Sequence, residues 1–183
     1  MGNLTKLVIF GDPQKKGVIE KISQFTEFVK DKADIIGNYN IIKLHNECLH
    51  PKGPIKNKVT EIQDVLQKCD YAVVFGGDGS IICTARFVSD ANVPVIGVNV
   101  GKLGFLAEFS VDDLTNLFTD IIDGKVAIEK RMMLNCCVIN SKDRSEKFCA
   151  PAINDIYLTA GTLLIYPSQS KGDRQIISQK IIQ

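Results

Sequence analysis

The sequence predicts an α/β protein, with an open, mainly parallel sheet and flanking helices, followed by the start of an all-β domain. As far as Gly124, short apolar runs alternate with amphipathic stretches whose apolar residues recur at helical spacing, a pattern typical of parallel strands joined by helices. After Gly124, successive strand-like runs replace that alternation. We therefore expect an α/β domain over 1–124, the beginning of a β-rich domain over 125–161 and a divergent tail over 162–183.

The strands and helices of the α/β domain are indicated by local pattern. Each strand is a short, mainly apolar run bounded by turn residues; the expected strands are Leu4–Phe10, Ile35–Leu44, Tyr71–Phe75 and Val95–Asn99. Each helix carries an apolar stripe opposite a polar face; the expected helices are Gln14–Lys32, Val59–Leu66, a helix that begins at Ile81, and Ser110–Asp123. The segment His45–Lys58 contains two prolines and a glycine without periodicity, so we expect a loop there.

The helix over Ser110–Asp123 has the clearest boundaries. Ser110 is a plausible N-cap, and Asp113 stands at the spacing of a capping box. Gly124 ends the apolar stripe. Acidic residues in a first helical turn usually complement the helix dipole, so we assign Asp112 and Asp113 to the helix terminus rather than to catalysis.

The β half is indicated by consecutive strand-like runs. We expect strands at Val126–Glu129, Met132–Asn140 and Phe148–Leu158, with a polar turn over Ser141–Lys147. Thr162–Tyr166 could add one more strand before a polar, basic tail. These segments are too few to close a core of their own.

Composition narrows the class of protein. The 183 residues are 45% hydrophobic and 23% charged, with a net charge of +1, as in an ordinary soluble globular protein. This balance gives no reason to expect nucleic acid or an anionic membrane as a partner. No apolar run reaches the roughly 18 residues that span a bilayer, and the pattern of the first residues gives no reason to expect a secretory signal. We expect a cytoplasmic protein.

Cysteine and histidine spacing argues against a metal or redox centre. None of the cysteines forms a CxxC pair, and His45 and His50 do not complete a zinc pattern. Most cysteines lie in apolar stretches, so we expect small, buried, reduced side chains; they stand at positions 48, 69, 83, 136, 137 and 149.

A glycine turn at the end of the third strand is the first candidate site. The apolar run Tyr71–Phe75 stops at Gly76-Gly77-Asp78-Gly79-Ser80, and a helical pattern follows. Glycines allow a ligand to approach the backbone, and a helix N-terminus offers N–H groups to an anion. Asp78 would lie at the carboxyl end of a strand, where open α/β sheets bind ligands. The alternative is a tight strand–helix turn with a capping aspartate.

A second glycine-containing loop follows the next strand. It reads NVGKLGFL over 99–106, and it would face the first glycine turn across a crevice. The alternative is a simple turn whose Phe105 plugs the core.

Three motifs together resemble the NAD kinases, the ATP- or polyphosphate-dependent enzymes that phosphorylate NAD. They are GGDGS at 76–80, NVGKLGFL at 99–106 and AINDIYL at 152–158. GGDG is shared with lipid kinases and phosphofructokinases, whereas the NxGxLGFL loop is far more specific. The resemblance extends from about Leu4 to Gly161 and implies a Rossmann-like N-terminal domain.

The resemblance also implies roles for individual residues. Asp78 would be the base that takes the proton from the 2′-hydroxyl of the adenosine ribose, and Phe105 would line the adenine pocket. Asn154 and Asp155 would bind and orient NAD. Phosphates would be held near Mg²⁺ by the backbone amides of Gly76, Gly77, Gly79 and Ser80. The full-length family is expected to form homo-oligomers.

The chain departs from the family after Gly161. Nothing there matches the family's second glycine- and threonine-rich motif, which resembles DGxxxSTPTGSTAY. One hypothesis is an NAD kinase. A second is a truncated, inactive nucleotide-binding fragment or partner subunit. A third, a lipid kinase sharing GGDG, is disfavoured by the 99–106 loop.

Overall fold

A computed structural model describes residues 4–44, 56–101, 104–153 and 176–182, with the backbone alone described for 56–60, 147–148, 150 and 176–182. The chain divides into two compact units, Met1–Glu129 and Lys130–Gln183, which we describe separately. The first unit contains β1 (Thr5–Gly11), α1 (Val18–Val29), β2 (Ala33–Asn40), α3 (Lys56–Leu66), β3 (Tyr71–Gly76), α4 (Asp78–Val88), β4 (Val95–Asn99) and α5 (Val111–Ile122).

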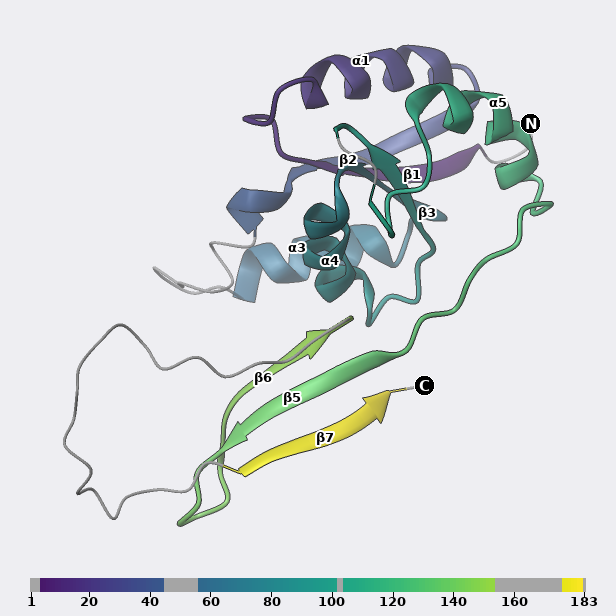
Figure 1. The fold of residues 1–183 in the computed structure, drawn as a ribbon. Coiled ribbons are helices and arrows are strands. Elements are labelled where there is room, and N and C mark those ends of the chain that lie inside the picture. The colour runs from purple at the N-terminus through teal and green to yellow at the C-terminus, as the bar shows by residue number, and fades with distance from the viewer. Residues whose placement is uncertain (1–3, 45–55, 102–103, 154–175, 183) are drawn as a thin grey trace. The chain divides into compact units, whose positions relative to one another are not determined.

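The four strands of the first unit form one parallel sheet in the order β2-β1-β3-β4. Strand β3, which leads into the glycine turn, therefore lies in the middle of the sheet, between β1 and β4; Figure 1 labels three strands of this sheet, β2, β1 and β3. Because the strands are parallel, their carboxyl ends meet at one edge, where ligands bind in such sheets. The predicted open parallel sheet is confirmed.

Helices cover both faces of this sheet (Figure 1). Alternate residues of β1 point to opposite faces, as a strand requires. Leu7 and Ile9 belong to a buried cluster shared with α1 and α5, whereas Val8 and Phe10 belong to a cluster shared with α3 and α4. Strands with two buried faces are near-continuously apolar, which explains the VVF run of β3.

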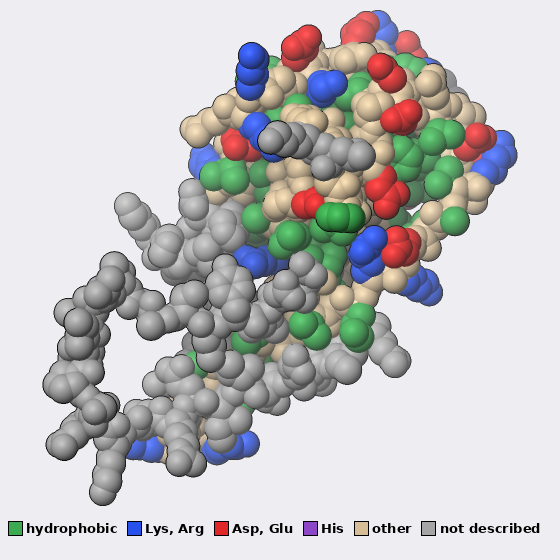
Figure 2. Space-filling model, viewed as in Figure 1, with side chains coloured by type: hydrophobic (Ala, Val, Ile, Leu, Met, Phe, Trp, Pro, Cys, Tyr) green, Lys and Arg blue, Asp and Glu red, His purple; other side chains and the backbone are tan. Residues whose placement is uncertain are grey.

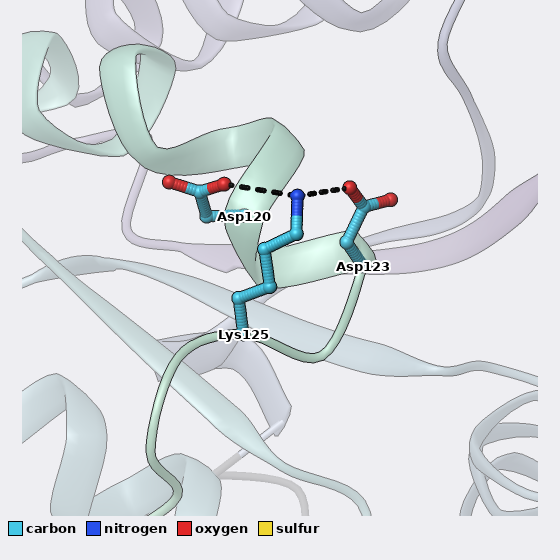
Figure 3. A network of polar contacts seen from close by, with 3 residues as sticks. All are labelled: Asp120, Asp123 and Lys125. Carbon is cyan, nitrogen blue, oxygen red and sulfur yellow. Dashed lines mark hydrogen bonds and ion pairs between the residues drawn. The ribbon is translucent and has the colours of Figure 1, made fainter.

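Helix α5 has the predicted capping box. The Ser110 hydroxyl accepts a hydrogen bond from the Asp113 amide, and the Asp113 carboxylate accepts one from the Ser110 amide. At the other end Gly124 adopts a positive φ of 69°, as is usual just past a helix. The ammonium group of Lys125 then lies 2.8 Å from Asp123 and 3.5 Å from Asp120 (Figure 3), so that the exposed helix end carries a small ion-pair network.

Ser110→Ala is expected to lower the free energy of unfolding by about 1 kcal/mol, because one amide of the first turn loses its acceptor. Urea unfolding of the variant and the parent measures this difference. Thr115→Ala is the matched control, since the Thr115 hydroxyl only donates to the Asp112 carbonyl within the helix. An unfolding midpoint unchanged by Ser110→Ala would contradict the prediction.

Several predicted elements differ from the structure: α1 spans Val18–Val29 within the expected 14–32, and α4 begins at Asp78 rather than Ile81. Residues 41–44 are helical rather than a continuation of the second strand, and α3 already begins at Lys56. The predicted strand Val126–Glu129 is wrong: these residues pair with no strand among those described. Val126 instead packs against the core cluster of α1 and α5. Local β-propensity does not produce a strand without a partner.

The second unit is an antiparallel sheet with the order β6-β5-β7. Its strands are β5 (Met133–Ile139), β6 (Glu146–Ala152) and β7 (Ile176–Ile182). The turn over 141–145 joins β5 to β6 near the expected place. The sequence assigns 176–182 to a tail, whereas the structure places β7 there. The expected strand Thr162–Tyr166 lies outside the described residues.

A disulfide joins Cys137 to Cys149, which are directly opposite one another in β5 and β6. The expectation that these two cysteines are buried and reduced is therefore wrong, because strand register, which single-residue spacing does not reveal, brings them together. Cys69, Cys83 and Cys136 are free and half-buried. Burial raises the pKa of Cys69 to about 11, so its thiol is protonated near neutral pH and unreactive. Cys48 lies outside the described residues.

We expect Cys137 and Cys149 to resist alkylation in protein that is purified and unfolded without reductant. Cys136, their neighbour in β5, is the internal control and should be labelled under the same conditions. Mass spectrometry of the peptides before and after reduction measures this. Labelling of all three residues without reductant would contradict the disulfide.

The surface of the first unit carries both signs of charge. On the face seen in Figure 2, Lys and Arg side chains are interspersed with Asp and Glu side chains. Within the described part of the chain, no helix is both long and apolar enough to traverse a bilayer.

Candidate functional site

The glycine turn connects the centre of the sheet directly to a helix. Strand β3 ends at Gly76, Gly77 is the N-cap residue in an extended conformation, and α4 begins at Asp78. A β-carbon on Gly76 would stand 2.2 Å from the hydroxyl oxygen of Ser80, so only glycine fits there. The first N–H groups of a helix have no acceptor within it. The amides of Gly77, Asp78 and Gly79 therefore have no acceptor within α4, and they lie at the carboxyl edge of the sheet.

The Asp78 carboxylate joins this turn to the second glycine-containing loop. Its Oδ2 accepts a hydrogen bond from the Phe105 amide at 2.8 Å, and its Oδ1 accepts from the amides of Leu106 at 3.0 Å and Ala107 at 3.3 Å. All three of these amides belong to the neighbouring loop and none belongs to α4, which spans Asp78–Val88. Asp78 thus bonds to the neighbouring loop rather than to its own helix, and the glycine turn and the 104–107 segment meet.

Glycines make this close approach possible. A β-carbon on Gly104 would stand 2.1 Å from Asp78 Oδ1. A β-carbon on Gly97, within β4, would stand 2.8 Å from the Leu106 carbonyl oxygen and 3.2 Å from the Ala107 Cα. Each position has at least one contact below 3.0 Å, which real β-carbons essentially never show, so a side chain at either position would force a neighbouring group to shift. The sequence analysis includes Gly104 in the 99–106 loop but does not predict its contact with Asp78, and it does not single out Gly97.

The loop returns along β4 and is held there by the backbone. The Asn99 amide donates to the Phe109 carbonyl at 2.7 Å, and the Phe109 amide donates to the Gly97 carbonyl at 3.2 Å. Nearer the glycine turn, the Val100 amide donates to the Gly76 carbonyl at 3.2 Å. The Asn99 side chain accepts from the Gly101 amide at 2.8 Å. The loop is thus anchored at both ends, and residues 102–103 between them lie outside the described part.

The hydrogen bond from the Phe105 amide, followed by those from Leu106 and Ala107, lowers the pKa of Asp78 below its ordinary value. The carboxylate is therefore ionised throughout the physiological pH range. Oδ1 uses both of its lone pairs on amides, whereas Oδ2 accepts one hydrogen bond in the structure and keeps a second acceptor position. That oxygen is the one available to a hydroxyl group or a cation.

The other predicted site residues are distributed as follows. Phe105 is 90% exposed, so the alternative in which it plugs the core is wrong. The Ser80 amide, which was expected to hold a phosphate, instead donates to the Gly77 carbonyl at 2.9 Å. The Ser80 hydroxyl lies against the Gly76 position, 2.2 Å from where a β-carbon on Gly76 would stand. Gly79 is exposed, with open space where a β-carbon would stand.

Four residues considered from the sequence cannot be placed. Asn154 and Asp155 lie outside the described residues, as do His45 and His50.

A parallel sheet with helices on both faces and an acidic glycine turn at its carboxyl edge defines the first unit as an open-sheet α/β domain. The family is given by its sequence: the ATP-NAD kinase N-terminal domain matches residues 7–126. The chain belongs to the NAD kinase family. It is 41% identical over 115 residues to an NAD kinase of Heliobacterium modesticaldum. The matched region covers 63% of this chain and 38% of the relative.

Other relatives extend the comparison into the second unit. An NAD kinase of Francisella tularensis subsp. novicida is 29% identical over 187 residues, covering 94% of this chain and 60% of the relative. The structure of yeast NADH kinase complexed with NADH superposes with a TM-score of 0.64 at 20% identity, covering 84% of this chain and 48% of the yeast chain, and this likeness concerns the fold. The chain spans between about two fifths and three fifths of the length of these curated relatives.

Proposed function

We propose that this protein is an NAD kinase, which transfers a phosphoryl group from ATP or polyphosphate to the 2′-hydroxyl of the adenosine ribose of NAD and forms NADP. The single observation that carries the proposal is the contact of the Asp78 carboxylate with the 105–107 amides. It places an ionised acid and two glycine-containing loops at the carboxyl edge of the sheet, in a chain whose family is the NAD kinases.

In the proposed reaction, the free position of Asp78 Oδ2 accepts the proton of the ribose 2′-hydroxyl as that oxygen attacks. A bond forms between the 2′-oxygen and the γ-phosphorus of ATP, the bond from that phosphorus to the bridging oxygen breaks, and ADP leaves. A low pKa makes Asp78 a weak base, but phosphoryl transfer through a loose transition state requires little proton removal before attack. Orientation of the hydroxyl by Oδ2 is then the larger contribution.

The remaining residues position the substrates. The amides of Gly77 and Gly79 face the phosphates, because N–H groups at a helix start bind anions. The exposed ring of Phe105 stacks on adenine. The phosphate oxygens fit the oxygen-only preference of Mg²⁺, which when bound would neutralise phosphate charge. We also propose that Asn154 and Asp155, which lie outside the described residues, bind NAD. We further propose a cytoplasmic location for this chain, and a homo-oligomer for the full-length family.

The test is an assay of the 183-residue chain with NAD, ATP or polyphosphate, and Mg²⁺, with NADP measured by an NADP-specific dehydrogenase. Calorimetric titration with NAD and with ATP is made in parallel. NADP formation that requires all three components supports the proposal and refutes the inactive-fragment hypothesis. Binding of both nucleotides without NADP formation supports a nucleotide-binding chain that lacks transferase activity. Failure to bind either nucleotide overturns the proposed function.

A further inference from the structure

The loop between β1 and α1, residues 12–17, lies beside the glycine turn. Strands β1 and β3 are parallel neighbours, and Gly11 at the end of β1 pairs with Phe75 near the end of β3. The loops that follow these two strands therefore leave the sheet at the same edge. The ammonium nitrogen of Lys15 lies 3.8 Å from the position that a β-carbon on Gly77 would occupy. A positive charge thus stands next to the turn that contains Asp78.

The backbone holds Lys15 in place although its side chain is exposed. The Lys15 amide donates to the Asp12 carbonyl at 3.0 Å, and the Lys15 carbonyl accepts from the Val18 amide at 3.2 Å. The Asp12 carboxylate accepts from the Gln14 amide at 3.0 Å. Gly17, at a φ of 84°, then turns the chain into α1. The side chain therefore starts from a fixed point and reaches toward the glycine turn.

A phosphoryl donor needs a cation at this place. Its phosphates carry several negative charges, and the nearest ionised group on the turn, Asp78, is itself negative. Amide N–H groups contribute only partial charges, so that a lysine ammonium, a compact point charge with three donors, is suited to the remaining phosphate oxygens. We propose that Lys15 is a phosphate-binding residue, whose ammonium group contacts the phosphates of the donor above Gly77. This inference rests on the proposed function, since it assigns a ligand to the same site.

The adjacent lysine provides a matched control. Lys16 is exposed like Lys15 and carries the same charge, but only Lys15 reaches within 4 Å of the Gly77 position. If only net charge mattered, Lys15→Ala and Lys16→Ala would lower the affinity for phosphate compounds equally. If Lys15 contacts the phosphates, Lys15→Ala alone would lower that affinity, and Lys15→Arg would largely keep it.

The experiment is calorimetric titration of the full chain and these three variants with ATP and with inorganic tripolyphosphate. We expect Lys15→Ala to weaken both affinities roughly tenfold, the loss of one charged hydrogen bond, while Lys16→Ala and Lys15→Arg change them less than about twofold. Acetylation of lysines, followed by mass spectrometry, should show tripolyphosphate protecting Lys15 and not Lys16. NAD affinity should be unchanged in Lys15→Ala.

The outcomes separate the two proposals. If the parent binds ATP and tripolyphosphate but Lys15→Ala and Lys16→Ala lose equal affinity, Lys15 is not a phosphate-binding residue and the proposed function stands. If Lys15 is acetylated equally with and without tripolyphosphate, the inference is overturned in the same way. If the parent binds neither probe, both the inference and the proposed function are overturned.

Discussion

Asp78→Ala is expected to release the 105–107 segment from the glycine turn. The amide protons of Phe105, Leu106 and Ala107 should then exchange with solvent faster by roughly an order of magnitude or more, because each loses a charged acceptor. All three amides donate to the one carboxylate, so their exchange should accelerate together. Hydrogen exchange followed by NMR measures the effect on the chain without any ligand, and hence independently of catalytic activity.

Two further variants sharpen this prediction. Asp78→Asn keeps one carbonyl oxygen and can accept from two amides at most, so we expect exchange between that of the parent and that of Asp78→Ala. Asp112→Ala removes an exposed acid from the first turn of α5 and should leave the three amides unchanged. Equal protection in the parent and in Asp78→Ala would mean that the carboxylate does not hold the loop.

The same variants separate two contributions of Asp78 to the proposed reaction. If Oδ2 takes the ribose proton, Asp78→Asn should lose roughly 10²–10⁴-fold in turnover while retaining nucleotide affinity. If the carboxylate acts by positioning the 105–107 segment, the main loss should be in nucleotide affinity rather than in turnover number. Asp78→Ala should then bind nucleotide more weakly than Asp78→Asn. Michaelis constants and turnover numbers for NAD, measured for both variants, decide between these patterns.

The pKa of Asp78 fixes the pH dependence of the loop contact. In the folded protein it lies below the ordinary aspartate value, which is about 3.9. The stabilisation is therefore fully present above that ordinary value and is lost as pH falls through the lower pKa of the folded state. The amide proton shifts of Phe105 and Leu106 should stay constant from pH 7 to pH 5 and change only in more acidic solution.

The sequence predicts the architecture well because strand burial and helix periodicity are local properties. The VVF run predicts a strand buried on both faces, and β3 is such a strand. Ser110 and Asp113 predict the start of a helix, and α5 begins there with a capping box. The expected meeting of the 76–80 turn and the 99–106 loop also follows from topology. Parallel strands that are neighbours in the sheet place their following loops at one edge, and β3 and β4 are neighbours.

Features that depend on the direction of a side chain, or on pairing across the sheet, could not be predicted in the same way. That Asp78 turns away from its own helix toward the 105–107 amides is a property of the assembled loops. Strand register alone brings Cys137 opposite Cys149. Strand β7 needs a partner far away in the sequence, and the helical turn at 41–44 is formed by the short apolar run IIKL, for which periodicity does not distinguish a strand from a helix.

Gly104→Ala is expected to disrupt the site from the opposite side. The new methyl group would stand 2.1 Å from Asp78 Oδ1, so either the 104–107 backbone or the carboxylate has to move and the three hydrogen bonds lengthen or break. We expect the free energy of unfolding to fall by about 1–3 kcal/mol, the usual effect of overpacking, and affinity for NAD and ATP to fall at least roughly tenfold. Urea unfolding and calorimetric titration measure the two effects.

A control and a double variant show whether the clash with Asp78 is the cause. Gly101 belongs to the same loop, but open space lies where its β-carbon would stand, and Gly101→Ala should change stability by no more than about 0.5 kcal/mol. Because Asp78→Ala removes the atoms that the Gly104 methyl group would meet, adding Gly104→Ala to Asp78→Ala should have little further effect on unfolding. Such non-additivity is the signature of residues in contact. If the two substitutions instead add fully, Gly104 is required for a reason other than its contact with Asp78.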